Sequence, residues 1–549
     1  MVSISDDPIV EQAVEQFEWT QYADYGTVRI GRIERPARLF AGSRRWVQDV
    51  PVPPGGARYE AHVGALGEPV EVRVGTSRTS VLEISARAGD WTAVTFDLDA
   101  SQGATQRLTF EVVSDPEVVT AWSAETVTPL KTDLRAPDVI LISLDTVRRD
   151  QLTPYAPSLW TTPNLATFAR EAVRFDRAIA TSSWTIGSHS VLFTGEFLAG
   201  SLGYDSRVEP EEYTLPEIFA ANGYRTYGVS GGPYTDPRWG LHQGFDEYVV
   251  SGARENAREA TSRAVEWIRD DPNTPKFLFL NLFDAHEHLE LSDDVQRLTG
   301  ITADIPSILW HELDYRQRPI TPDIRMRLLN AYRAELRSID EHLGQLFAFL
   351  KQSGRWDRTV VIVWADHGQL LGERGNIGHA YTLEEELLNV PLIIKPARGT
   401  LPAPRTYPHV FQEDDLFSLV QAVAGLKTEA GEEIMGSIAA DRPVKRLAFS
   451  TIHHDPLPAL VAHPRWRSAT QWAVRDQTHK IVRDLEGRTV AYDISSDEER
   501  IVPLPSTDPL LLPALDGFQS WLRQRPATRT IGPLSPAEIE RLRSLGYIR

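Results

Sequence analysis

The sequence contains three apolar runs that each end in acidic or imidazole side chains. DVILISLD occupies residues 138–145, KFLFLNLFDAHEH occupies 276–288, and VIVWADH begins the stretch 361–379. Continuous apolar runs of this kind are typical of strands that are buried on both faces of a sheet. Segments with the spacing of amphipathic helices lie between them, the longest at 322–354. This alternation predicts an α/β fold, in which a mostly parallel sheet carries helices on both faces.

The pattern changes on either side of this α/β region. Short segments of alternating polarity, separated by Gly, Pro and Asp, predict an N-terminal β-sandwich over 1–130. After a linker, we expect the α/β domain over 136–440. Residues 441–549 predict a small antiparallel subdomain and a helical tail, whose last helix begins at a capping box from Ser535 to Glu538. A chain of 549 residues is long enough for such a division.

Composition excludes several classes of protein. The chain has no cysteine, so disulfides, zinc–thiolate sites and thiol nucleophiles are excluded. Its formal net charge of −19 disfavours nonspecific binding to nucleic acid, and we expect no nucleic-acid partner. No apolar run has the length of a membrane span, and the N-terminus lacks the basic and apolar regions of a signal peptide. These features predict a soluble, cytoplasmic protein and give no indication of its oligomeric state.

Acidic and imidazole groups recur at the ends of the predicted strands. Because the carboxyl ends of parallel strands meet at one edge of a sheet, we expect these groups to converge. Oxygen and imidazole ligands without sulfur suit one or two divalent cations: Zn²⁺ or Mn²⁺ is favoured, with Mg²⁺ or Ca²⁺ as alternatives. The candidate ligands are Asp145, Asp284, His286, His288, Asp366, His367 and, after a glycine-bracketed loop, His379.

Small polar residues lead into a predicted helix in TSSWTIGSHSVLFTG, 181–195. Ser and Thr are common as helix N-caps, which is one interpretation of this run. The other is a hydroxyl nucleophile, because a helix N-terminus and a nearby cation both stabilise an alkoxide. The same position would also hold a tetrahedral oxyanion such as phosphate. Spacing alone does not choose among Ser182, Ser183, Thr185 and Ser188.

From about residue 136 to 500 the chain resembles the sulfatase branch of the alkaline phosphatase superfamily. The resemblance rests on several stretches, including PDVILISLDTVRRDQL, TSSWTIGSHSVLFTG, FLFLNLFDAHEH and WADHGQLLGERGNIGHAYTLEEELLNVPLIIKP. It implies an alkaline-phosphatase-like fold and one metal held by Asp145, Thr185, Asp366 and His367. For a second metal it implies Asp284, His288 and His379. A competing alignment places His286 on the substrate instead.

The chain departs from the sulfatase pattern at the nucleophile. Sulfatases carry C-x-P-S-R or S-x-P-S-R, whose first residue becomes formylglycine, whereas this chain reads Thr185-Ile186-Gly187-Ser188-His189. Threonine cannot form formylglycine, so the resemblance implies a threonine nucleophile, as in phosphodiesterases and phosphoryl-group transferases of the superfamily. The chain also has Asp366-His367 where sulfatases have Asp-Asn, which favours Zn²⁺ or Mn²⁺ over Ca²⁺.

These features together predict a metal-dependent hydrolase of a small anionic ester. Our leading hypothesis is a phosphodiester or phosphonate monoester substrate, with Thr185 attacking phosphorus to form a covalent phospho-threonine. His189, His286 or His379 would protonate or orient the leaving group. The alternatives are a phosphoryl-group transferase with the same intermediate, a sulfuric ester hydrolase without formylglycine, and a non-catalytic binding protein on the same fold. The sequence does not identify the organic part of the substrate.

Overall fold

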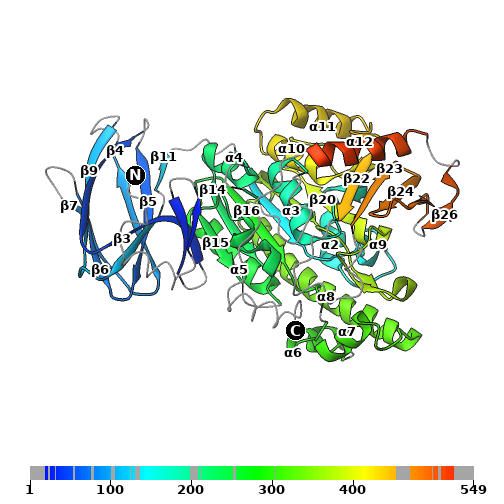
Figure 1. Ribbon diagram of the computed structural model, residues 1–549. Helices are drawn as coiled ribbons and strands as arrows, with labels where there is room; N and C mark the ends of the chain where they lie inside the picture. The colour runs from blue at the N-terminus through cyan, green and yellow to red at the C-terminus, as the bar shows by residue number, and fades with distance from the viewer. Residues whose placement is uncertain are drawn as a thin grey trace.

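We describe the protein from a computed structural model (Figure 1). The structure describes residues 19–524 apart from 23–24, 31–32, 53–55, 76–79, 100–104, 124, 130–135, 198–207, 210–211, 252–254, 288, 303–304, 453–469, 497–498 and 505–508. The predicted capping box at Ser535 and the predicted ligand His288 lie outside the described residues. Within the described part, no helix is both long and apolar enough to cross a membrane.

A large, mostly parallel sheet forms the centre of the molecule. Its central strands, in order across the sheet, are β15 (Glu247–Val250), β14 (Arg225–Ser230), β16 (Lys276–Leu282), β12 (Asp138–Leu144) and β17 (Thr359–Trp364). Neighbours in this row run parallel. The sheet then continues through β20 (Asn389–Lys395), β13 (Val173–Ile179) and β21 (Arg405–Phe411), with β20 antiparallel to its neighbours. The predicted α/β class with a mostly parallel sheet is confirmed.

Helices cover this sheet on two sides (Figure 1). One set contains α3 (Thr185–Thr194), α4 (Leu215–Ala221), α10 (Glu413–Val423) and α11 (Glu429–Ala439). The other contains α2 (Pro163–Ala169), α5 (Ala257–Asp270) and α8 (Pro322–Gln352). Because both faces are covered, every residue of β12, β16 and β17 is buried, which explains their continuous apolar sequences. α8 corresponds to the long helix predicted over 322–354.

The N-terminal part of the chain forms two sheets that face each other. β4 (Arg44–Pro51), β9 (Thr105–Val113), β6 (Val70–Gly75) and β7 (Ser80–Ala86) make one sheet. Its side chains pack against β5 (Ala57–Leu66) and β10 (Val119–Ser123), as in the ring contacts Tyr59–Phe110 and Trp46–Trp122. The two facing sheets agree with the predicted sandwich, but the second sheet is not separate, because β3 (Ile33–Ala41) pairs with β15 and continues the central sheet.

The C-terminal unit is antiparallel and supports the segment that precedes α3. It contains β22 (Ala448–Ile452), β23 (Gln471–Arg475), β24 (His479–Asp484), β25 (Thr489–Asp493) and β26 (Arg500–Val502). α12 (Leu511–Gln524) packs against β23 and β24. The Ser450 hydroxyl donates to the Ala180 carbonyl, and the Thr451 N–H donates to the Thr181 carbonyl. β22 therefore fixes the chain just before the predicted nucleophile.

Candidate active site

The ends of β12 and β17 bring two acidic residues together. Parallel pairing places Ser143 opposite Trp364, so Asp145 and Asp366 leave the sheet side by side. Ligand atoms of Asp145, Asp366 and His367 all lie within 4.8 Å of one another, and the three side chains are fully buried. The predicted convergence of strand ends therefore creates a compact group of oxygen and imidazole donors.

No arginine or lysine of the described residues pairs with these two carboxylates. Neither oxygen of Asp145, nor Oδ2 of Asp366, accepts a hydrogen bond within the described part of the chain. Burial, followed by the charges of Asp366 and Glu287, raises the pKa of Asp145 well above its usual range. Burial lowers the pKa of His367 to about 4, so its imidazole is neutral. Buried carboxylates without a counter-charge, beside a neutral imidazole, are a donor set that fits a divalent cation.

Thr185 is the residue of the run 181–195 whose hydroxyl contacts this group among the described residues. It is the first residue of α3, and its Oγ1 lies 3.3 Å from Nε2 of His367. His189 of the same run also approaches the group, with its Nδ1 3.6 Å from Oδ2 of Asp366. The Ser188 hydroxyl points elsewhere, because it donates to the Ser182 carbonyl. Of the four hydroxyls that spacing left open, that of Thr185 is the one with a contact to a residue of this group within the described part of the chain.

His189 lies behind Thr185, in the layer between α3 and the sheet. Its Nδ1 is 2.8 Å from the Thr185 carbonyl oxygen, and its Nε2 is 3.0 Å from Oγ of Ser143 in β12. The imidazole is fully buried and packs edge-on against Phe279 and Trp364. Both ring nitrogens therefore have protein partners. A residue that protonates a leaving group needs a ring nitrogen that faces the substrate, whereas both nitrogens of His189 face protein groups.

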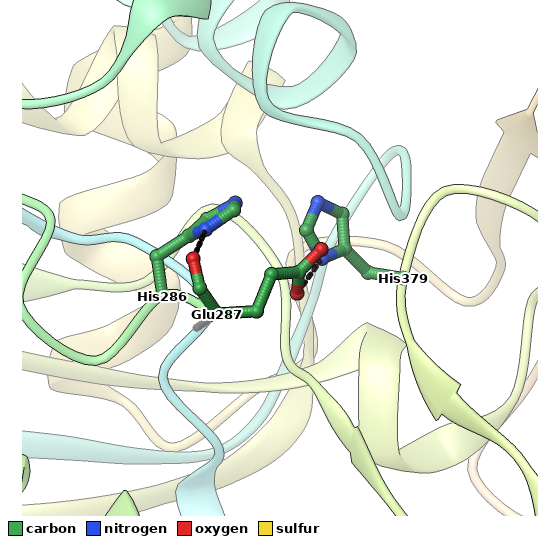
Figure 2. Close-up of side chains that lie close together, drawn as sticks. All are labelled: His286, Glu287 and His379. Carbon is green, nitrogen blue, oxygen red and sulfur yellow. Dashed lines mark hydrogen bonds and ion pairs between the residues drawn. The ribbon is translucent and has the colours of Figure 1, made fainter. Parts of the chain in front are cut away.

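A second group of possible ligands, drawn in Figure 2, adjoins the first through His379. Ligand atoms of His286, Glu287 and His379 lie within 4.8 Å of one another. The His379 ring is 4.5 Å from that of His367 and 5.0 Å from that of His286, between centroids. His379 Nδ1 lies 3.2 Å from Oε2 of Glu287 and 2.9 Å from Oε1 of Gln369. The structure thus brings two predicted residues, His286 and His379, next to the first group.

Asp284 takes a different place from the one expected of a metal ligand. Its Oδ2 accepts hydrogen bonds from the backbone N–H groups of Asn256 and Ala257, at 3.1 Å each, at the N-terminus of α5. Burial raises its pKa to about 7. It belongs to neither group of possible ligands among the described residues. This acid at the end of β16 thus satisfies the free amides of a helix. Its predicted role as a metal ligand together with His288 stays a prediction, because His288 lies outside the described residues.

Glu287 and Gln369 are the site residues that sequence reasoning missed. Gln369 donates from Nε2 to Oε2 of Glu287 at 2.5 Å and accepts from His379 through Oε1. Each stands close in sequence to a predicted ligand, Glu287 directly after His286 and Gln369 two residues after His367. Their closeness in sequence to predicted ligands is the feature by which sequence reasoning could have found them.

The sulfatase family model matches residues 137–426, more than half of the chain and the part that holds both ligand groups and Thr185. The chain belongs to the sulfatase family. This membership confirms the resemblance to the sulfatase branch of the alkaline phosphatase superfamily.

Curated relatives of this sulfatase-family protein are distant. An N-acetylglucosamine-6-O-sulfatase of Bacteroides thetaiotaomicron is 22% identical over 365 residues, and the match covers 49% of this chain and 64% of that protein. An ulvan-active sulfatase of Formosa agariphila is 22% identical over 401 residues, covering 66% of this chain and 75% of that protein. The chain thus spans less than two thirds of the first relative's length.

Solved structures share the fold of the sulfatase-family protein. The phosphonate monoester hydrolase of Agrobacterium radiobacter superposes with a TM-score of 0.55 at 16% identity, covering 70% of this chain and 95% of that one. A putative sulfatase from Bacteroides fragilis gives a TM-score of 0.53 at 17% identity, covering 76% of this chain and 99% of that one. At these identities the likeness shows the fold alone.

Proposed function

We propose that this sulfatase-family protein is a metal-dependent hydrolase of phosphate esters, acting on a phosphodiester or a phosphonate monoester. The observation that carries this proposal is the 3.3 Å contact between Thr185 Oγ1 and His367, inside a buried group that fits a cation. Formylglycine chemistry needs cysteine or serine at that position, and this chain has threonine there and no cysteine anywhere. The printed activity of one structural neighbour, a phosphonate monoester hydrolase, supports the same reading.

The residues of the first group would bind the cation in this proposal. Asp145, Asp366, His367 and Thr185 would hold the cation, whose charge supplies Lewis-acid stabilisation to the threonine oxygen and to the ester. The N-terminus of α3 adds favourable electrostatics for negative charge on Thr185 Oγ1.

In each of two steps, one bond to phosphorus forms and one breaks. Thr185 Oγ1 gives up its proton and attacks phosphorus, the bond to the leaving oxygen breaks, and the leaving oxygen takes up that proton. Water then attacks the phospho-threonine, the bond to Oγ1 breaks, and the proton lost by water returns to Oγ1. His286, Glu287 and His379 lie beside His367 and would act on the leaving oxygen or on the substrate.

The test compares Thr185→Ala with wild type on four matched aryl esters: a phosphodiester, a phosphonate monoester, a phosphate monoester and a sulfate. We expect wild type to have its highest kcat/KM on one of the first two. Thr185→Ala should lose at least about 10³-fold in kcat, because it removes the nucleophile, while its metal content stays close to that of wild type. Thr194→Ala, at the other end of α3, is the matched control and should stay active.

The names of the relatives favour one second candidate, a sulfuric ester hydrolase that works without formylglycine. The same four substrates separate the two functions. A wild-type enzyme that turns over the aryl sulfate faster than every phosphorus ester would replace the proposed function by the second. Full activity of Thr185→Ala on any of the four substrates would show that Thr185 is the nucleophile in neither candidate function.

A further inference from the structure

We propose that Glu413 is a positioning residue for Thr185, because it holds the segment 181–184 that leads into α3. The inference rests on the proposed function and deepens it, since it concerns how the nucleophile is kept beside the cation. Glu413 is the first residue of α10, and its Oε2 accepts a hydrogen bond from the backbone N–H of Thr181 at 3.0 Å. This contact joins two parts of the chain that are 232 residues apart.

Glu413 and Thr451 hold both backbone groups of Thr181. The N–H donates to Glu413, and the carbonyl accepts from the N–H of Thr451 in β22 at 2.9 Å. All three residues are buried, so water does not replace either partner. Loss of the Glu413 carboxyl would leave a buried N–H without an acceptor, which favours displacement of the segment. The position of Thr181 therefore depends on Glu413.

Ser182 and Ser183 carry this restraint to Thr185. The Ser182 carbonyl accepts from the hydroxyl of Ser188, in the first turn of α3, at 3.0 Å. The Ser183 carbonyl accepts from the N–H of Ala380, at 2.9 Å, in the loop that carries a predicted site histidine. A displaced segment would therefore move the start of α3, where Thr185 lies. A misplacement of about 1 Å can cost a reaction about 10²-fold in rate.

Glu413 acts as a neutral acid in this proposal. Among the described residues no arginine or lysine ion-pairs with it, and Lys445 pairs with Asp414 and Asp415 instead. Burial, with the charge of Asp414 as a smaller cause, raises the pKa of Glu413 well above its usual range, against the opposing effect of backbone N–H groups. A neutral carboxyl keeps the acceptor oxygen that Thr181 uses.

Two buried oxygens at this contact favour the neutral form. Oε1 of Glu413 and Oγ1 of Thr181 have no hydrogen-bond partner within the described part of the chain. An O–H on Oε1 can donate to a buried oxygen, whereas an ionised carboxylate can only accept. Glutamine, which is neutral and has both a donor and an acceptor, should therefore replace Glu413, and leucine should not.

The experiment compares Glu413→Leu and Glu413→Gln with wild type, in the full metal-loaded chain, on the one of the four aryl esters that wild type turns over fastest. Glu413→Leu should lose about 10–100-fold in kcat with KM within about 3-fold of wild type, because substrate still binds while Thr185 is displaced. Its metal content should stay close to that of wild type. Glu413→Gln should keep kcat within about 3-fold of wild type.

Amide hydrogen exchange gives a second readout that does not depend on turnover. Peptides that cover residues 178–186 should exchange faster in Glu413→Leu, because the Thr181 N–H loses its acceptor. In Glu413→Gln they should exchange at the wild-type rate. Mass spectrometry of peptides from the folded protein measures both variants under the same conditions.

Glu429→Leu and Glu429→Gln are the matched controls. Glu429 is the first residue of α11, as Glu413 is of α10, but it is exposed. Both control variants should match wild type in kcat and in the exchange of residues 178–186.

Several outcomes would overturn the role of Glu413. One is a folded Glu413→Leu enzyme with the kcat of wild type, even if its thermal stability is lower. Another is a Glu413→Gln enzyme that loses 10-fold or more in kcat, and this variant keeps the test decisive if Glu413→Leu does not fold. The two proposals fail separately. A wild type that turns over only the aryl sulfate, or none of the four esters, would overturn the proposed function, whereas unchanged exchange of residues 178–186 in Glu413→Leu would overturn the role of Glu413.

Discussion

At the scale of single residues, His189 stands where the sulfatase pattern has arginine, and it supports Thr185, the proposed nucleophile. Burial lowers the pKa of His189, so the imidazole is neutral. Its two nitrogens bond to the Thr185 carbonyl and to the Ser143 hydroxyl, which ties the first turn of α3 to β12. Sequence reasoning identified His189 as part of the site but gave it a proton-transfer role. The spacing of residues in a sequence does not show whether an imidazole on a helix contacts the substrate or the protein behind the helix.

The variant His189→Leu tests this supporting role. It keeps the bulk of the side chain but leaves the buried Ser143 hydroxyl unpaired and removes the imidazole bond to the Thr185 carbonyl, so the free energy of unfolding should fall by about 1–2 kcal/mol. Urea denaturation measures this change, and metal analysis should show an unaltered metal content. His189→Gln, which retains a donor and an acceptor, should recover part of the stability. A residue that protonates the leaving group behaves differently: its loss would cut kcat by 10²-fold or more and leave stability intact.

At the scale of elements, several helices begin at acids that come from distant parts of the chain. Asp284 accepts N–H groups at the start of α5, and Asp340 of α8 accepts those of Asn164 and Leu165 at the start of α2. The positions of strands and helices were predictable because apolar periodicity is local in sequence. Helix caps supplied from another part of the fold are not local in sequence, so the capping role of Asp284 could not be predicted from its position at a strand end. Asp145 and Asp366 were predictable because neighbouring parallel strands end together.

Asp284→Ala separates capping from metal binding. Removal of a carboxylate that accepts helix N–H groups should destabilise the protein by about 1–2 kcal/mol. The number of bound ions per chain should not change, because Asp284 belongs to neither group of possible ligands among the described residues. Thermal or urea unfolding and metal analysis on the same preparation give both quantities. A stable Asp284→Ala protein with one ion fewer would show instead that Asp284 is a metal ligand.

At the scale of the whole molecule, the N-terminal strands extend the central sheet. Sequence patterning separated residues 1–130 from the α/β region, because alternating segments between turns are typical of a sandwich. The connection itself is small: Glu34 and Ile33 of β3 pair with Tyr248 and Val249 of β15. No sequence pattern specifies which edge strands meet. Ion pairs strengthen the connection, since Arg225 of β14 binds both carboxylate oxygens of Glu60 in β5, at 2.8 and 2.9 Å.

This continuity predicts that the N-terminal sheets and the α/β region unfold together. Calorimetry of wild type should therefore show one transition across both parts. Glu60→Gln leaves the guanidinium of Arg225, whose side chain is 5% exposed, with Asp246 as its remaining carboxylate partner. Because Glu60 is itself 23% exposed, the expected loss is about 2 kcal/mol, below that of a fully buried pair. Glu83→Gln removes an exposed pair with Arg73 in the outer sheet and should change little. A separate early transition for the N-terminal sheets would show that the shared strands do not couple the two parts.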